Sequence, residues 1–303
     1  MGNPYSSSFY AITTSKPMNS SIYSEEGVKH ILSKSKILLK KSLGQNLLLD
    51  PVACDAIAAA AGTLENEIVI EIGPGIGNLT NAILKNKPSK LIAIEKDISL
   101  KTILNQLELK HPELTVEYED ALRVNVKDLA EHPVHIFGNL PYNISTQLIF
   151  KWMEERCWIK SLTLTLQSEV SDRICAAPGT KDYGKLSILS QIFFDCTKVL
   201  KLKSGLFFPI PKVDSTTVHM VPKTQIPDKS VLDRVRFITA TAFSQRRKML
   251  RQSLKSAFKS PEDACKNANI SPQSRAENVT VEQYIQLAQL LIESGPDVLQ
   301  ILK

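Results

Sequence analysis

The sequence predicts an α/β fold with a doubly wound, mostly parallel sheet and a smaller C-terminal helical domain. Short apolar segments typical of buried strands alternate with segments of helical periodicity through most of the 303 residues. Beyond Pro222 the strand pattern fades and only helical spacing remains. We therefore place a first domain at residues 31–222 and a helical domain at 223–303. Residues 1–30 lack periodicity, and we expect them to form a disordered tail.

The expected helices and strands follow one another in a regular order. A first helix begins at Pro51, with Asp50 as its N-cap, and can end at Gly62. Expected strands cover 67–73, 90–97, 115–120, 134–139 and 162–167, and two of the helices between them cover 78–86 and 99–109. In the helical domain the segments 230–243, 246–258 and 281–293 carry helical spacing.

Composition excludes several classes of protein. No apolar run approaches the ~18 residues that a spanning helix needs, so we expect no membrane association. The five cysteines are scattered and form no C-x-x-C pair, which argues against structural zinc and against a disulfide framework. We expect no metal site and a cytoplasmic location.

Positive charge is clustered along the chain. Eight Lys or Arg and no acid lie between Arg234 and Pro261, and five Lys and no acid lie between Lys29 and Lys41. In the helix expected at 246–258 the leucines and Phe258 fall on one face and the cations on roughly the opposite one. Such clustering favours a polyanionic partner, although solvated helix faces have the same pattern.

A glycine-rich turn follows the first expected strand. Gly73, Gly75 and Gly77 let the backbone turn tightly and approach a ligand closely, but their spacing is not that of dinucleotide-binding proteins. Glu95 ends the next strand, where a carboxylate can accept hydrogen bonds from both ribose hydroxyls. Asp120 ends the third, within reach of an adenine amino group. Together these strand ends predict a nucleoside site.

The fourth strand ends in the sequence NLPY, which matches the pattern of amino-methyltransferases that use S-adenosylmethionine. The exocyclic amine of adenine is a poor nucleophile because its lone pair is delocalised into the ring. We expect the Asn139 side-chain oxygen and the Leu140 carbonyl to hold the protons of this amine. Pro141 restricts the backbone, and Tyr142 offers a ring on which the base can stack.

Motifs along almost the whole chain resemble those of one enzyme family, the small-subunit ribosomal RNA adenine N6-dimethyltransferases (the bacterial 16S rRNA dimethyladenosine transferases). The segments that carry this resemblance are KKSLGQNLLLD (40–50), EIGPGIGNLT (71–80), IEKD (94–97), EDAL (119–122), FGNLPYNIS (137–145), QSEVSDRICAAPGTKDYGKLSI (167–188), FFPIPKVDSTTV (207–218), FSQRRKMLRQSLK (243–255) and RAENVTVEQYIQLA (275–288). The resemblance implies a Rossmann-like methyltransferase sheet with S-adenosylmethionine as cofactor.

The resemblance also implies roles for particular residues. Asn46 and Leu48 would cover the cofactor beside Gly73, Gly75, Glu95, Asp120 and Asn139. Phe207 would face Tyr142 across the target adenine, with the adjacent Phe208 as the alternative. One departure is Leu47, where the family usually has phenylalanine. The residues expected to contact RNA phosphates are Arg246, Arg247, Lys248, Arg251, Lys255 and Lys259.

The function that follows is dimethylation of the N6 amines of two adjacent adenines near the 3′ end of small-subunit rRNA during ribosome maturation. The expected partner is rRNA within an immature subunit, and we expect the protein to act as a monomer. Two alternatives remain at this point. One is the related resistance methylase that acts on large-subunit rRNA. The other is a non-catalytic RNA-binding or transcription factor on the same fold.

Overall fold

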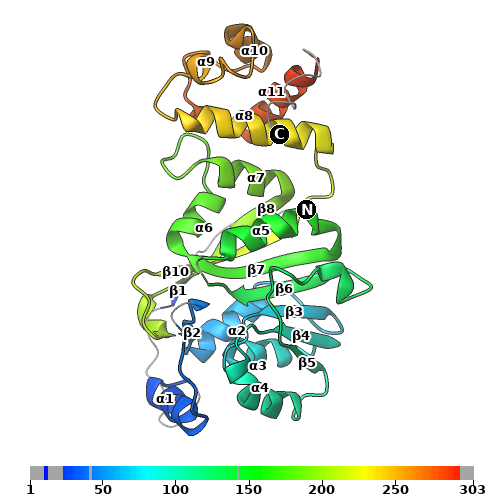
Figure 1. Ribbon diagram of the computed structural model, residues 1–303, viewed down its shortest axis with the longest axis vertical. Helices are drawn as coiled ribbons and strands as arrows, with labels where there is room; N and C mark the ends of the chain where they lie inside the picture. Colours follow the sequence, from blue (N-terminus) through cyan, green and yellow to red (C-terminus); the bar gives the residue numbers. More distant parts are fainter. Residues whose placement is uncertain (1–9, 13–22, 41–42, 142, 294–303) are drawn as a thin grey trace. The chain divides into compact units, whose positions relative to one another are not determined.

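The computed structural model describes residues 10–12, 23–40, 43–141 and 143–293 (Figure 1). The chain divides into two compact units. The first comprises residues up to Ser171 together with Cys196–Pro222, and the second comprises Asp172–Asp195 and the chain from Lys223 onward. Residues 172–195 therefore join the C-terminal unit, although the sequence placed them in the first domain. Helix α7 (Lys185–Phe193) packs on α8 (Lys229–Ser244), which explains this difference.

A mixed sheet forms the centre of the first unit. Its order within the described residues is β1-β8-β10-β7-β6-β3-β4-β5. The pairs β3–β4, β4–β5, β3–β6 and β6–β7 are parallel, and β10 runs antiparallel to β7. The strands of this sheet are Tyr10–Ile12 (β1), Ile68–Ile72 (β3), Lys90–Ile94 (β4), Leu114–Glu117 (β5), Val134–Asn139 (β6), Ile159–Gln167 (β7), Phe194–Leu202 (β8) and Ser215–Pro222 (β10). The predicted doubly wound, mostly parallel sheet is confirmed.

The strand order reverses beside β3. The chain moves outward from β3 through β4 to β5 and then returns to β6 on the other side of β3. In open parallel sheets a ligand binds at such a switch point, outside the carboxyl ends of the strands. The helices of this unit include α2 (Pro51–Ala59), α3 (Asn78–Leu84), α4 (Lys101–Glu108), α5 (Ser145–Glu154) and α6 (Ser168–Ile174), which continues into the second unit.

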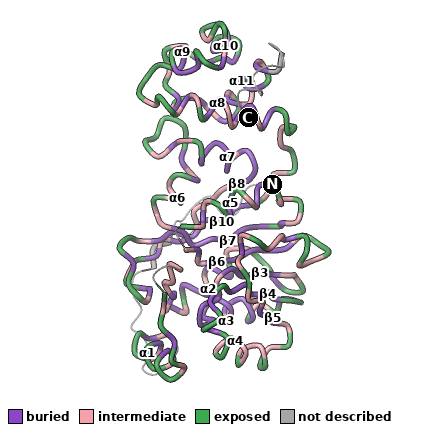
Figure 2. The backbone as a smooth tube through the Cα atoms, viewed as in Figure 1, coloured by how far each residue is buried: buried purple, intermediate pink, exposed green. Residues whose placement is uncertain are grey.

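The strands next to the switch point are buried and apolar. Figure 2 shows β3, β4, β6 and β7 as largely buried segments. A separate two-stranded sheet pairs β2 (Leu47–Leu48) antiparallel with β9 (Phe207–Phe208). Asp50 caps α2 as predicted, because its carboxylate accepts a hydrogen bond from the Ala53 N–H at 2.7 Å. Within the described ranges, no helix combines the length and apolar content that crossing a bilayer requires.

Part of the N-terminal segment is folded, so the expectation of disorder through residue 30 is wrong there. Strand β1 pairs in parallel with β8, and α1 covers Glu25–Lys34. The hydroxyl of Ser24 caps α1 by accepting the Gly27 N–H, and Val28 and Leu32 are buried beneath the helix. Residues 1–9 and 13–22 lie outside the described residues.

The C-terminal unit is helical, as predicted, but one expected helix is broken. Its elements beyond α7 are α8, α9 (Leu250–Ser253), α10 (Pro261–Asn267) and α11 (Val281–Glu293), and α11 packs on α8. The helix expected over 246–258 is reduced to the four residues of α9. Extended backbone at Met249 forms a bridge to Arg275, and the Leu250 N–H donates to the Ser274 carbonyl at 2.6 Å. These long-range partners replace the hydrogen bonds that would have continued a helix.

Candidate active site

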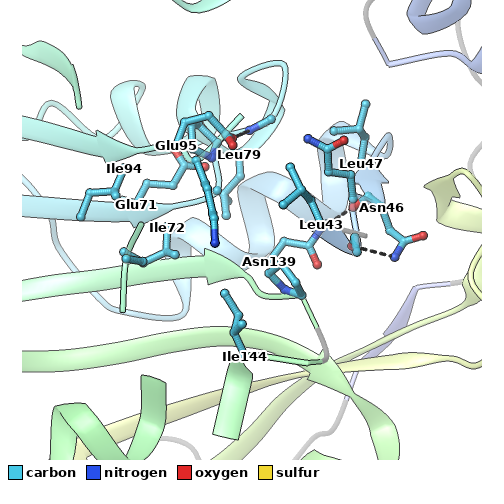
Figure 3. Close-up of a pocket in the computed structure, with 18 of the residues that line it drawn as sticks. Leu43, Asn46, Leu47, Glu71, Ile72, Leu79, Ile94, Glu95, Asn139 and Ile144 are labelled. Atoms are coloured by element: carbon cyan, nitrogen blue, oxygen red, sulfur yellow. Dashed lines mark hydrogen bonds between the residues drawn. The ribbon is translucent and has the colours of Figure 1, made fainter. Parts of the chain in front are cut away.

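A pocket lies at the carboxyl ends of β3, β4 and β6, beside the switch point (Figure 3). It gathers residues from five separate segments of the first unit. These lining residues are Leu43–Leu48, Glu71–Ile76, Asn78, Leu79, Ile94–Lys96, Glu119–Ala121, Asn139, Pro141, Asn143 and Ile144. All seven residues that the sequence assigned to the cofactor are among them. The sheet geometry therefore brings these residues together.

The glycine turn and Glu95 form one hydrogen-bonded unit. Gly73 and Gly75 adopt positive φ values of 70° and 59°, which favour glycine over residues with a Cβ atom. The Glu95 carboxylate accepts the Gly75 N–H at 3.3 Å and the Asp97 N–H at 2.7 Å. Burial raises the pKa of Glu95, although these two N–H groups act in the opposite direction. Glu95 thus supports the turn, and its carboxylate, with about four acceptor positions, still has room for a ligand hydroxyl.

Asp120 lies at the edge of the pocket. Its Oδ2 accepts a hydrogen bond from Lys96 Nζ at 2.7 Å, and its Oδ1 accepts the Leu122 N–H at 3.0 Å. The bond from Lys96 lowers the pKa of Asp120, so this carboxylate is ionised at neutral pH. The arrangement fixes the loop after β5 against the end of β4.

Asn139 is the last residue of β6, and Figure 3 shows it beside the segment that carries Leu43 and Asn46. Its Nδ2 donates to the Asn46 carbonyl at 2.6 Å. The carboxamide nitrogen is therefore occupied, while Oδ1 accepts no hydrogen bond from any described residue. This tether leaves an acceptor oxygen at the pocket, which is the chemistry that an exocyclic amine requires.

A clamp centred on Asp97 holds the N-terminal segment at the pocket. Asp97 is buried, and its carboxylate accepts from Lys40 Nζ at 2.7 Å and from Gln45 Nε2 at 2.8 Å. Burial alone would raise the pKa of Asp97, but the bonds from Lys40, Ser99 and Gln45 outweigh it and lower the pKa to about 2. Since Asp97 follows Glu95 by two residues, the same strand end supports the glycine turn and the covering segment.

Two pocket residues that the sequence analysis did not select carry unsatisfied acceptors. Glu71 Oε2 and Asn78 Oδ1 are buried and have no hydrogen-bond partner within the described part of the chain. Buried acceptors of this kind require a donor. A charged residue inside the otherwise apolar strand IVIEI was the available signal for Glu71. Asn78 offered no comparable signal, because its side chain is placed by donating to the Leu48 carbonyl at 2.7 Å.

The ionisation of Glu71 should make the ligand-free protein less stable as pH rises. Burial, together with the nearby charge of Glu95, raises the pKa of Glu71 from 4.5 to about 7, although Thr80 opposes the shift. A raised carboxyl pKa contributes stability below pH 4.5 that is lost as pH rises to about 7. Glu71→Gln cannot ionise at this position. As pH rises to about 7, the unfolding free energy of the wild type should therefore fall by up to about 3 kcal/mol relative to that of Glu71→Gln. Urea unfolding of both proteins between pH 5 and 8 measures this difference.

The matched control for that comparison is Glu65→Gln, which changes an exposed glutamate just before the same strand. The unfolding free energy of Glu65→Gln should change with pH in the same way as that of the wild type between pH 5 and 8. A wild type whose stability stays parallel to that of Glu71→Gln across this range would contradict the buried-acid assignment.

Two of the described residues expected at the target base, Leu140 and Phe207, do not line the pocket. Leu140 is buried, and its N–H donates to the Thr165 carbonyl at 3.1 Å, while the role of its own carbonyl stays a prediction. Tyr142 lies outside the described residues. Phe207 is 2% exposed and packs in the apolar core, since β9 pairs with β2. In this conformation it cannot stack on a base, whereas Phe208 is half-buried with Lys29 Nζ 5.5 Å from its ring centroid.

The basic residues expected at RNA fall into two groups. Arg246 is held within the protein, because Nε donates to Glu277 at 2.7 Å and Nη2 to the Lys181 carbonyl at 2.5 Å. Two of its donor groups are therefore occupied, but its side chain stays 39% exposed, and its contact with an RNA phosphate stays a prediction. Arg251 pairs with Glu262 at 2.8 Å. The remaining four, Arg247, Lys248, Lys255 and Lys259, are exposed.

The doubly wound sheet, the glycine turn supported by Glu95 and the amide that ends β6 together define the class of Rossmann-like methyltransferases. Residues 37–293 match the family model for ribosomal RNA adenine dimethylase. The chain belongs to this family, whose members are enzymes.

Individual relatives agree with this assignment. The chain is 45% identical over 257 residues to the ribosomal RNA small subunit methyltransferase A of Wolbachia sp. subsp. Drosophila simulans (strain wRi), covering 84% of this chain and 94% of the relative. It is 26% identical to a dimethyladenosine transferase from Plasmodium falciparum, with a TM-score of 0.70 over 82% of this chain and 98% of the other. The 23S rRNA methyltransferase ErmE shares the fold at 24% identity, with a TM-score of 0.66 over 81% and 99% of the two chains.

Proposed function

We propose that this protein transfers methyl groups from S-adenosylmethionine to the N6 amines of two adjacent adenines near the 3′ end of small-subunit rRNA. The observation that carries the proposal is the tethered amide of Asn139 at the end of β6. Its free oxygen lies at a pocket lined by the glycine turn, Glu95 and Asp120. The match to small-subunit enzymes at 45% identity supports this target over the large subunit.

The pocket residues fit S-adenosylmethionine. Glu71 and Asn78 present the buried acceptors that lack partners, which suits the ammonium group of the cofactor. Glu95 retains lone pairs for the ribose hydroxyls, and Gly73 leaves open space where a Cβ atom would stand. When bound, the cofactor supplies a methyl group activated by a sulfonium centre. Asn46 and Leu48 line the same pocket from the segment that Asp97 clamps.

The protein contributes position and hydrogen bonding to the reaction. Asn139 Oδ1 would accept an N6–H of adenine, which lessens the delocalisation of the amine lone pair into the ring and turns it toward the methyl group. The proton can leave after transfer, so no strong general base is required. Orientation of this kind is a large source of rate enhancement. The adenine must leave its stack to reach the pocket.

The exposed cations of the C-terminal unit are proposed to contact the rRNA backbone. Arg247, Lys248, Lys255 and Lys259 extend into solvent and can neutralise phosphates without reading sequence. We further propose that the protein acts as a cytoplasmic monomer on an immature small subunit. Selection of the two adenines would then come from the shape of the RNA and its ribosomal surroundings.

Incubation of the protein with S-adenosylmethionine and immature small subunits tests the proposal. Mass spectrometry of the rRNA should find N6,N6-dimethyladenosine at two adjacent positions near the 3′ end. The matched control uses large subunits under the same conditions, which should remain unmodified. Methylation of the large subunit alone would support a resistance methylase instead. Binding of small subunits without any methylation would support a non-catalytic RNA-binding protein.

A further inference from the structure

The C-terminal unit carries a basic groove of about 330 Å³, separate from the cofactor pocket. It lies where the chain after α9 turns into α10. Its lining consists of Arg251, Gln252, Lys255, Lys259, Ser260, Pro261 and Glu262. Three of these side chains are cationic and one is anionic. The groove therefore has a net positive charge.

Arg251 is only partly satisfied in this groove. Its Nη1 donates to Glu262 Oε1 at 2.8 Å, whereas Nε is buried and has no partner among the described residues. A guanidinium presents its donors as a planar fork that matches two acceptor oxygens at once. The single contact to one oxygen of Glu262 does not use this ability to bind two acceptor oxygens. Arg251 can therefore take an additional or a replacement anion with two oxygens.

Two lysines supply the remaining positive charge of the groove. Lys255 and Lys259 are exposed, and neither forms an ion pair within the residues that the structure describes. The other acid nearby, Asp263, is turned to Ser260, whose Oγ donates to its Oδ2 at 2.5 Å. Glu262 is thus the carboxylate that occupies the groove. An anion bound between the cations would relieve their mutual repulsion.

We propose that this groove binds a phosphodiester group of the rRNA backbone, and that Glu262 competes with it for Arg251. The inference rests on the proposed function, because it takes rRNA as the partner. The Arg251–Glu262 pair is partly exposed, at 39% and 52% for the two side chains, so its attraction is weak. A chain of high charge density such as rRNA can displace the carboxylate.

The competition is tested with Glu262→Gln, which keeps the shape of the side chain and removes its charge. Binding of a fluorescently labelled hairpin from the 3′ end of small-subunit rRNA should tighten by about three- to tenfold at moderate salt. Arg251→Gln should weaken binding by a similar factor. In the Arg251→Gln background, Glu262→Gln should give little further tightening, because the competing contact is already absent.

The matched control is Asp263→Asn, which removes the same charge one residue further along while leaving Arg251–Glu262 intact. It should tighten binding by less than about twofold. Equal tightening by Asp263→Asn and Glu262→Gln would overturn the proposal, since it would reveal a general charge effect. Displacement of the hairpin by a polyglutamate of equal charge as effectively as by unlabelled RNA would identify an acidic-peptide site and also overturn it.

Methyl transfer by each variant is measured in parallel with binding, after circular dichroism and thermal unfolding have established that the variant folds. If Glu262→Gln binds the hairpin no more tightly than the wild type, while the wild type still dimethylates small-subunit rRNA, the groove proposal is rejected and the proposed function stands. Absence of methylation by the wild-type protein rejects the proposed function and leaves the binding measurements as a separate result.

Discussion

Asn139→Ala is expected to reduce the rate of methyl transfer at saturating cofactor by about 100- to 1,000-fold, the range typical for loss of one preorganised polar contact. The substitution removes the oxygen that would accept the adenine N6–H and also the Nδ2 that donates to the Asn46 carbonyl. The main loss should appear in the turnover number, because the contact acts on the reacting amine. Single-turnover methylation of immature small subunits with radiolabelled S-adenosylmethionine measures it.

Asn86→Ala provides the matched control for Asn139. Its amide donates within α3 and the following turn, to the Ala82 carbonyl at 2.9 Å, and it does not line the pocket. This variant should transfer methyl groups at close to the wild-type rate. Near wild-type turnover by a folded Asn139→Ala would refute the assigned role. In that case the amide would serve only to join β6 to the covering segment.

Glu95→Gln is expected to weaken S-adenosylmethionine binding by about 100-fold, equivalent to about 3 kcal/mol. Both carboxylate oxygens accept backbone N–H groups, one from Gly75 and one from Asp97. A glutamine has only one acceptor oxygen, so its amide NH₂ would face an N–H donor on the other side. The glycine turn would lose its support, and the ribose would lose an acceptor oxygen. Isothermal titration calorimetry with S-adenosylmethionine gives the dissociation constant.

Glu119→Gln separates geometry from charge in this experiment. Glu119 also lines the pocket but is exposed, and its removal subtracts the same unit of charge. Because exposed charges are screened by water and salt, binding should change by less than about threefold. A folded Glu95→Gln protein that binds the cofactor as tightly as Glu119→Gln would rule out the proposed ribose contact.

The cofactor-side residues could be found from the sequence because each lies where a strand ends. Gly73, Glu95 and Asn139 follow or end β3, β4 and β6, and parallel strands present their carboxyl ends at one edge. Alternation of strands and helices was therefore enough to place these side chains near one another. No contact between distant residues had to be known in advance.

The sequence was less informative in the C-terminal unit. The cations around α9 have amphipathic spacing, and Leu250 and Leu254 are indeed buried. Yet the backbone there bonds to Ser274 and Pro272 instead of continuing a helix. Periodicity reports which side chains face the core, but hydrogen-bond partners from a remote segment decide the local backbone conformation.

The amino-acid sequence by itself determined the five strands β3 to β7, the helices α2, α3 and α4, the glycine turn and the residue types at the strand ends, because these depend on local periodicity and backbone freedom. It did not predict β1, β8 and β10, which complete the sheet. Only the tertiary structure decided that Phe207 is buried against the core, that Arg246 pairs with Glu277 and that Arg251 faces Glu262. The pairing of β9 with β2 and the ion pairs join residues that are far apart along the chain. Whether such a side chain meets solvent, core or counter-ion depends on how the folded segments pack, which local residue pattern does not encode.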